Sequence, residues 1–157
     1  AGVNMEHDEW SSPMSAVTKA VLMLAADEAP DILINMHSHN WDPSILPISY
    51  VSQKVREELF HLESKYKEAL MENGYGYRDL NILDRKSVLT SILNHVCGGI
   101  CFCFECPHGC ADIRHSDNKP GLKSNYGYED IMKAEELLVS CTADYLLGRQ
   151  SDTEIRR

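Results

Sequence analysis

Hydrophobic residues along this chain recur with two spacings, one typical of amphipathic helices and one typical of buried strands. Ser12 followed by Pro13 favours a helix start, and Pro30 favours the end of that helix. Between these points the helical spacing predicts a core-facing stripe of Met14, Val17, Val21 and Leu24. The apolar run that follows, from Asp31 to His37, predicts a buried strand that ends at His37.

Three further helices are predicted in the rest of the chain. Their apolar stripes cover residues 55–70, 88–96 and 131–145. Asp84 is the expected N-cap of the middle one. Glycines are expected to end all three helices, at Gly74, Gly98 and Gly148. Residues from Gln150 onward are expected to fray.

A second buried strand is predicted from Ile100 to Glu105, where the sequence reads Ile-Cys-Phe-Cys-Phe-Glu. Strand alternation places Cys101, Cys103 and Glu105 on one face. The element order predicts an α/β fold with part of a mixed central sheet flanked by helices. Because two strands make a poor sheet, either the central sheet is only partly contained in this chain, or further strands lie within the weakly patterned stretches 44–51 and 75–83.

Length and charge restrict the classes of protein and partner. A chain of 157 residues with 43% hydrophobic content fits one globular domain. The net charge of -9, with Lys and Arg scattered among acids, argues against nucleic acid and anionic membranes as partners. No apolar run reaches the roughly 20 residues of a membrane span, and no signal peptide is evident. Five of the six cysteines lie between Cys97 and Cys110, which indicates reduced thiols and favours a cytoplasmic location.

Candidate chemistry lies at the ends of the two predicted strands. His37 and His39 come at the C-terminal end of the first strand, and open α/β sheets bind their ligands at that edge. Glu105 closes the second apolar run, where a carboxylate requires a compensating interaction. These residues are therefore the first candidates for metal binding or catalysis. We expect His37 to end a central strand with its side chain near Glu105, both at the same edge of one sheet.

Four segments resemble the zinc carboxypeptidase family, the metallocarboxypeptidases of the carboxypeptidase A type. That family has a Gly-Val-Asp-x-Asn-Arg segment, a strand ending in His-Ser-Tyr, a strand of the form Phe-Thr-Phe-Glu and a C-terminal helix. The similar segments here are Ala1-Gly-Val-Asn4, Met36-His-Ser-His39, Phe102-Cys-Phe-Glu105 and the helix from about Tyr128. The resemblance implies a Zn²⁺ cofactor, with His37 as one metal ligand and Glu105 as the general base and acid. It further implies a hydrolase, a metallopeptidase or amidase, acting on a peptide or amide substrate.

The sequence departs from the family pattern in two places. The family's other two zinc ligands come from an upstream His-x-x-Glu motif, which this sequence lacks. Residues 1–157 are therefore expected to form the C-terminal half of the catalytic domain, with an upstream half as a partner. Glu6-His7 follows Met5 where the family has Asn-Arg, so a terminal-carboxylate substrate is not assured. Candidate substrate-binding residues are His39, Glu6, His7, Tyr75, Tyr77 and His108.

Two other interpretations remain open. A structural zinc module could use Cys103-x-x-Cys106 together with His108 and Cys110, because two cysteines at this spacing are a common half-site. An inactive member of the family, retained as a binding domain, would also fit the altered Glu6-His7 pair.

Overall fold

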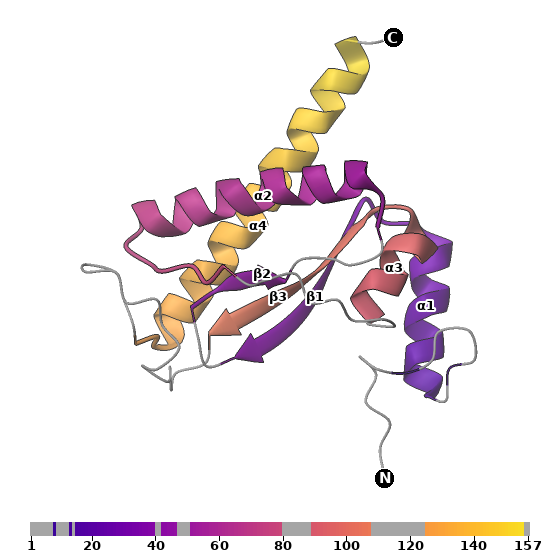
Figure 1. Cartoon of the computed structure of the whole chain (residues 1–157), viewed down its shortest axis with the longest axis horizontal. Coiled ribbons are helices and arrows are strands. Elements are labelled where there is room, and N and C mark those ends of the chain that lie inside the picture. Colours follow the sequence, from indigo (N-terminus) through magenta and orange to yellow (C-terminus); the bar gives the residue numbers. More distant parts are fainter. Residues whose placement is uncertain are drawn as a thin grey trace. The chain divides into compact units, whose positions relative to one another are not determined.

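The computed structural model has a mixed three-stranded sheet in the order β1–β3–β2, with four helices in the described part of the chain. Figure 1 shows β1 and β3 running in the same direction and β2 in the opposite one. The predicted α/β fold is confirmed. The described residues are 8, 13, 15–39, 42–46, 51–79, 89–107 and 125–155. The elements are α1 (Ala16–Glu28), β1 (Ile32–His39), β2 (Ser44–Leu46), α2 (Gln53–Glu72), α3 (Leu89–Cys97), β3 (Ile100–Pro107) and α4 (Tyr128–Ile155).

Backbone contacts divide the chain into two compact units, and each strand passes from one unit to the other. The first unit comprises Ala1–His37, Ile45–Glu57 and Leu80–Phe104. The second comprises Ser38–Ser44, Glu58–Asp79 and Glu105–Arg157.

Helices α1 and α3 lie side by side in the first unit (Figure 1) and share a small apolar core. The core residues are Ala25, Leu89, Leu93, Cys97 and Cys101, with Val21, Leu22, Leu33 and Val96 packed against them. Because Cys101 belongs to β3, the two helices pack against one face of that strand through this cluster.

Helix α1 begins later than predicted and faces the core differently. Its N-cap is Ser15, whose Oγ accepts hydrogen bonds from the backbone N–H groups of Val17 and Thr18. Thr18 and Ala25 are the buried positions, whereas Val17 and Leu24 are 55% and 61% exposed. The predicted start at Ser12–Pro13 is therefore wrong, because the cap lies three residues further along. The predicted stripe is wrong at Val17 and Leu24, whereas Val21 does pack against the core, and Met14 lies outside the described residues.

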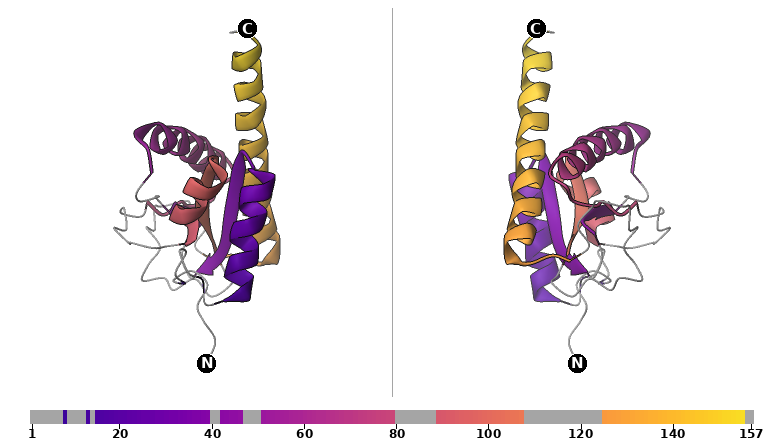
Figure 2. Two further views of the ribbon diagram at one scale, coloured as in Figure 1. Left: turned by 90° about the vertical axis from the view of Figure 1, so that its right-hand side faces the viewer. Right: turned by 90° about the vertical axis from the view of Figure 1, so that its left-hand side faces the viewer.

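In the second unit, α2 and α4 cross each other, as Figures 1 and 2 show. The Tyr66 hydroxyl, fully buried on α2, donates a hydrogen bond of 3.1 Å to the backbone oxygen of Ala134 on α4. A second bond of 2.9 Å joins the Tyr145 hydroxyl to Glu58. Helix α4 continues to Ile155, so the predicted stop at Gly148 is wrong. An interior glycine costs a helix only about 1 kcal/mol, and this one has no left-handed backbone that would end it.

Two glycine stops are confirmed, and β2 lies within 44–51, one of the two stretches in which a further strand was considered. Gly74 after α2 has a φ of 79° and Gly98 after α3 a φ of 69°, values that favour glycine. The predicted cap at Asp84 lies outside the described residues. Within the described part of the chain, no helix is both long enough and apolar enough to cross a membrane.

The β1 strand differs from its prediction in length and in burial. It ends at His39 instead of His37, and its residues are half-buried, with Met36 50% exposed. Strand β3 is buried along its whole length. The difference arises because β3 is the middle strand of the described sheet, whereas β1 is at its edge.

The start of β3 approaches the start of β1 closely. A Cβ on Gly99 would lie 2.2 Å from the backbone oxygen of Pro30, so only glycine fits there. The next residue, Ile100, donates its N–H to the oxygen of Asp31 at 2.9 Å. This bond sets the register of the two strands.

The side chain of Asn94, on α3, hydrogen-bonds to the backbone of β3 at Cys101. Its side-chain oxygen accepts the N–H of Cys101 at 2.8 Å, and its amide donates to the oxygens of Cys101 and Thr90 at 2.6 and 3.0 Å. Asn94 is 7% exposed, so no solvent replaces these bonds. One side chain therefore satisfies both backbone groups of Cys101 where β3 begins.

We expect Asn94→Ala to destabilise the fold by roughly 2–6 kcal/mol, because it removes the hydrogen bonds that two buried backbone groups make to this side chain, at about 1–3 kcal/mol each. Urea unfolding monitored by circular dichroism measures this change. Asn73→Ala is the matched control, because Asn73 makes an exposed bond to the oxygen of Ala69. Equal losses from the two variants would contradict the role given to Asn94.

Candidate metal and catalytic site

His37 lies near the C-terminal end of β1, on the face that meets α3. Asn35, two residues earlier and therefore on the same face, donates a hydrogen bond of 3.0 Å to Thr90 Oγ1 of α3. This bond orients the β1 strand against the first turn of α3. The imidazole of His37 follows on that face and is half-buried.

Strand β3 supplies Cys103 and Glu105 to the same face. Cys101 packs in the α1–α3 cluster on that side, and alternation then places Cys103 and Glu105 in line with it. The two side chains are 5% and 7% exposed. The predicted alternation along this strand is confirmed.

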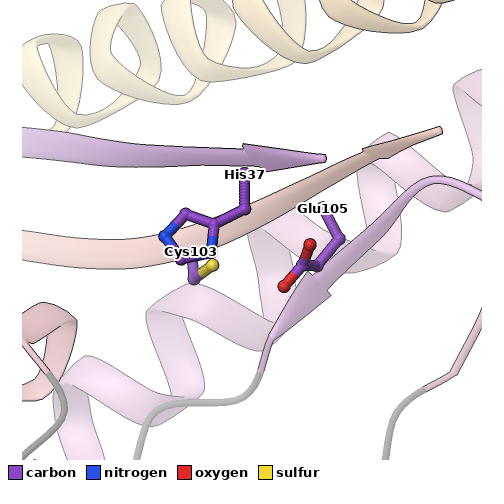
Figure 3. A group of neighbouring side chains, drawn as sticks. All are labelled: His37, Cys103 and Glu105. Carbon is purple, nitrogen blue, oxygen red and sulfur yellow. The ribbon is translucent and has the colours of Figure 1, made fainter. Parts of the chain in front are cut away.

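The side chains of His37, Cys103 and Glu105 converge. One potential ligand atom from each residue lies within 4.8 Å of the other two. Figure 3 shows the imidazole of β1 and the thiol and carboxylate of β3 pointing toward one another. The predicted proximity of His37 and Glu105 is therefore confirmed, although β1 is an edge strand of the described sheet and not a central one.

The donor set suits a zinc ion. Imidazole nitrogen, thiolate sulfur and carboxylate oxygen are the three ligand types that Zn²⁺ takes in proteins, at about 2.0–2.3 Å. A tetrahedral ion with such bonds holds its ligand atoms roughly 3.5 Å apart. The group found here needs a closure of about an ångström, which side-chain rotation can supply. The residues present therefore fit the metal that the carboxypeptidase resemblance implies.

Cys103 is the member of this group to which the carboxypeptidase resemblance assigned no ligand role, whereas the alternative zinc module used its thiol together with that of Cys106. The signal was present in the sequence, because alternation had already placed Cys103 beside Glu105. What the sequence could not show was the register that brings His37 next to the thiol.

The other predicted substrate-binding residues lie in several places. His39 is the last residue of β1, two positions beyond His37, and is half-buried. Tyr75 donates a hydrogen bond of 3.2 Å to Asp130 and stacks on Tyr126. Tyr77 is 7% exposed and donates to Glu63. Glu6, His7 and His108 lie outside the described residues.

Tyr75 and Tyr77 are thus held within the second unit. Their hydroxyls are engaged by carboxylates of α4 and α2, so both rings have a clear packing role. A role of either tyrosine in substrate binding stays a prediction.

Cys106 is placed differently from Cys103. The strand was predicted to end at Glu105, but β3 continues to Pro107, and Cys106 lies on the face opposite to Cys103. Its thiol donates to a carboxylate oxygen of Glu135 at 3.4 Å. Burial, the hydrogen bond to Glu135 and the charge of Glu135 raise the pKa of Cys106 to about 12. A zinc half-site on Cys103-x-x-Cys106 would need both thiols on one side and ionised, which this arrangement does not favour.

Comparison with solved structures finds a similar protein, a metallo-carboxypeptidase from Burkholderia cenocepacia, with a TM-score of 0.66 and 13% sequence identity. The match covers 92% of this chain and 38% of that protein, so the chain spans well under half of the carboxypeptidase. No protein-family model and no curated protein matches the sequence. At this identity the similarity shows the fold alone. The chain therefore has an α/β fold similar to part of a metallo-carboxypeptidase, with a group of potential metal ligands on one face of its sheet.

Proposed function

We propose that this chain carries part of the active site of a zinc-dependent hydrolase of the carboxypeptidase type. The observation that supports this most is the convergence of His37 and Glu105, which come from two distant segments and meet on one sheet face. The similar fold of a metallo-carboxypeptidase supports the same assignment. The substrate class is a peptide or amide.

In this proposal each residue has a distinct task. His37 holds the metal through an imidazole nitrogen. When bound, zinc acts as a Lewis acid and lowers the pKa of its water to about 7. Glu105 accepts the proton of the attacking water and returns it to the leaving amine nitrogen. The low exposure of Glu105 keeps bulk water from competing for that proton.

The family's remaining ligands form part of the proposal. A His-x-x-Glu motif does not occur among these 157 residues, so the carboxypeptidase arrangement requires ligands from an upstream half of the domain. Activity is therefore to be measured in the longest natural form of the polypeptide that contains these residues. Metal binding without hydrolysis in that form would favour an inactive carboxypeptidase-like binding domain instead.

Glu105→Gln tests the assignment of the base. The change keeps the size of the side chain but removes its basicity, so turnover should fall about 10²–10⁴-fold while zinc content stays near that of the wild type. Release of amine from a panel of peptides and amides measures turnover, and elemental analysis measures zinc. Glu68→Gln, on the exposed face of α2, is the matched control and should leave both unchanged. Undiminished turnover in Glu105→Gln would show that another group is the base.

His37→Ala tests the ligand and should give a different pattern. Losing one ligand should lower zinc content and hydrolysis together, and added zinc should restore part of the activity. His61→Ala is the control, because His61 is an exposed imidazole on α2. If His37→Ala retained full zinc but lost activity, His37 would act on the substrate and not on the metal.

A further inference from the structure

Cys103 is the residue of this site that the proposed function leaves without a task. Its thiol, one potential ligand atom of His37 and one of Glu105 all lie within 4.8 Å of one another. His37 and Cys103 belong to the same compact unit, on two adjacent strands, and the register bond from Ile100 to Asp31 lies in that unit too. The imidazole and the thiol are therefore placed next to each other by the backbone.

The described cysteines of β3 differ sharply in what surrounds them. Cys101 is fully buried in the apolar α1–α3 cluster. The Cys106 thiol donates a hydrogen bond to Glu135 on the other face of the strand. Cys103 has an imidazole and a carboxylate beside it, both of which are metal-binding groups. Of these three thiols, only Cys103 belongs to a group of three potential ligands found among the described residues.

We propose that Cys103 is a metal ligand, and that His37 and Cys103 together bind a thiophilic divalent cation such as Zn²⁺, with Glu105 beside the ion. The inference shares its site with the proposed function but rests on the donor atoms of this chain alone. Nitrogen and sulfur donors select zinc or cobalt over magnesium or calcium, which prefer oxygen. Such a site gives the chain two ligands of its own without the His-x-x-Glu motif.

Binding requires the thiolate form of Cys103. The S–H bond breaks, the sulfur keeps the electron pair and forms the bond to the metal, and the proton leaves to solvent. Glu105 can relay this proton as it leaves, because its carboxylate lies beside the thiol. The step needs no oxidant, reductant or other reactant.

Cobalt absorption tests the assignment directly on the 157-residue chain. Co²⁺ added to the reduced protein should give an intense near-ultraviolet band from thiolate-to-metal charge transfer, and Zn²⁺ should remove the band by displacing cobalt. Cys103→Ser is close in size to the wild type, but its hydroxyl is a poor ligand, so it should lose the band. Its loss of zinc affinity should exceed the roughly 10–100-fold that follows when only an orienting partner of a ligand is removed.

Cys106→Ser is the matched control, because Cys106 lies on the same strand with the same 5% exposure as Cys103. It should keep the band. Circular dichroism verifies that each variant folds, and Cys103→Ala provides a second variant if Cys103→Ser is unstable. A band that persists without Cys103, a wild type without any band, or equal loss in the Cys103 and Cys106 variants would each overturn the proposal. The last result would favour the Cys103-x-x-Cys106 module.

The outcomes also separate this inference from the proposed function. A thiolate band that depends on Cys103, in a protein that hydrolyses none of the peptides or amides, contradicts the hydrolase assignment and leaves the ligand assignment standing. Hydrolysis that depends on Glu105, in a protein without the band, contradicts the assignment of Cys103 as a ligand and leaves the hydrolase assignment standing.

Discussion

The pairing of β1 with β3 is the constraint on which the candidate site depends. Gly99 allows the backbone of the α3–β3 turn to approach Pro30, and the bond from Ile100 to Asp31 then fixes which residues face each other. In this parallel pair the residue level with Ile100 is Ile32, which follows the acceptor Asp31. His37 lies five residues after Ile32 and Glu105 five residues after Ile100, so the two side chains lie at the same level of the sheet. A slip of one residue would turn the imidazole to the opposite face. The chemistry of the site therefore follows from a backbone contact made at the far ends of both strands.

The same alternation gives neighbouring cysteines of one strand different chemistry. Cys103 faces the imidazole of His37, whereas Cys106 faces the carboxylate of Glu135, which together with burial raises the pKa of the Cys106 thiol. A thiol whose neighbouring ligand group is a carboxylate keeps its proton, whereas a thiol that also has an imidazole within reach can exchange its proton for a cation held by both groups. The chemistry of these cysteines therefore depends on the face of the strand on which each one lies, and not on the residue type alone.

Much of the fold could be predicted from local patterns in the sequence. The order of the elements, the alternation along β3 and the turns at Gly74 and Gly98 depend on residues close together in the chain, and all are confirmed. Predictions were wrong where packing against residues distant in the sequence determines which side chains are buried. The face of α1 is set by α3, and the exposure of β1 follows from its place at the edge of the described sheet. The site was predicted in part, because His37 and Glu105 were expected to meet, whereas the ligand geometry of Cys103 depends on strand register.

Glu105 has two possible roles, and they compete. A carboxylate oxygen that coordinates a metal shares its lone pair with the cation and becomes a poor base, whereas one that faces a water can take its proton. The number of other ligands decides between them, because a catalytic zinc keeps one position open and a structural zinc fills all four. If His37 and Cys103 were joined by no other ligand than Glu105 from the described residues, Glu105 would coordinate the metal to complete its shell. Any further ligand from an upstream segment would release Glu105 for proton transfer, so the carboxylate can act as a base only when the rest of the site is supplied.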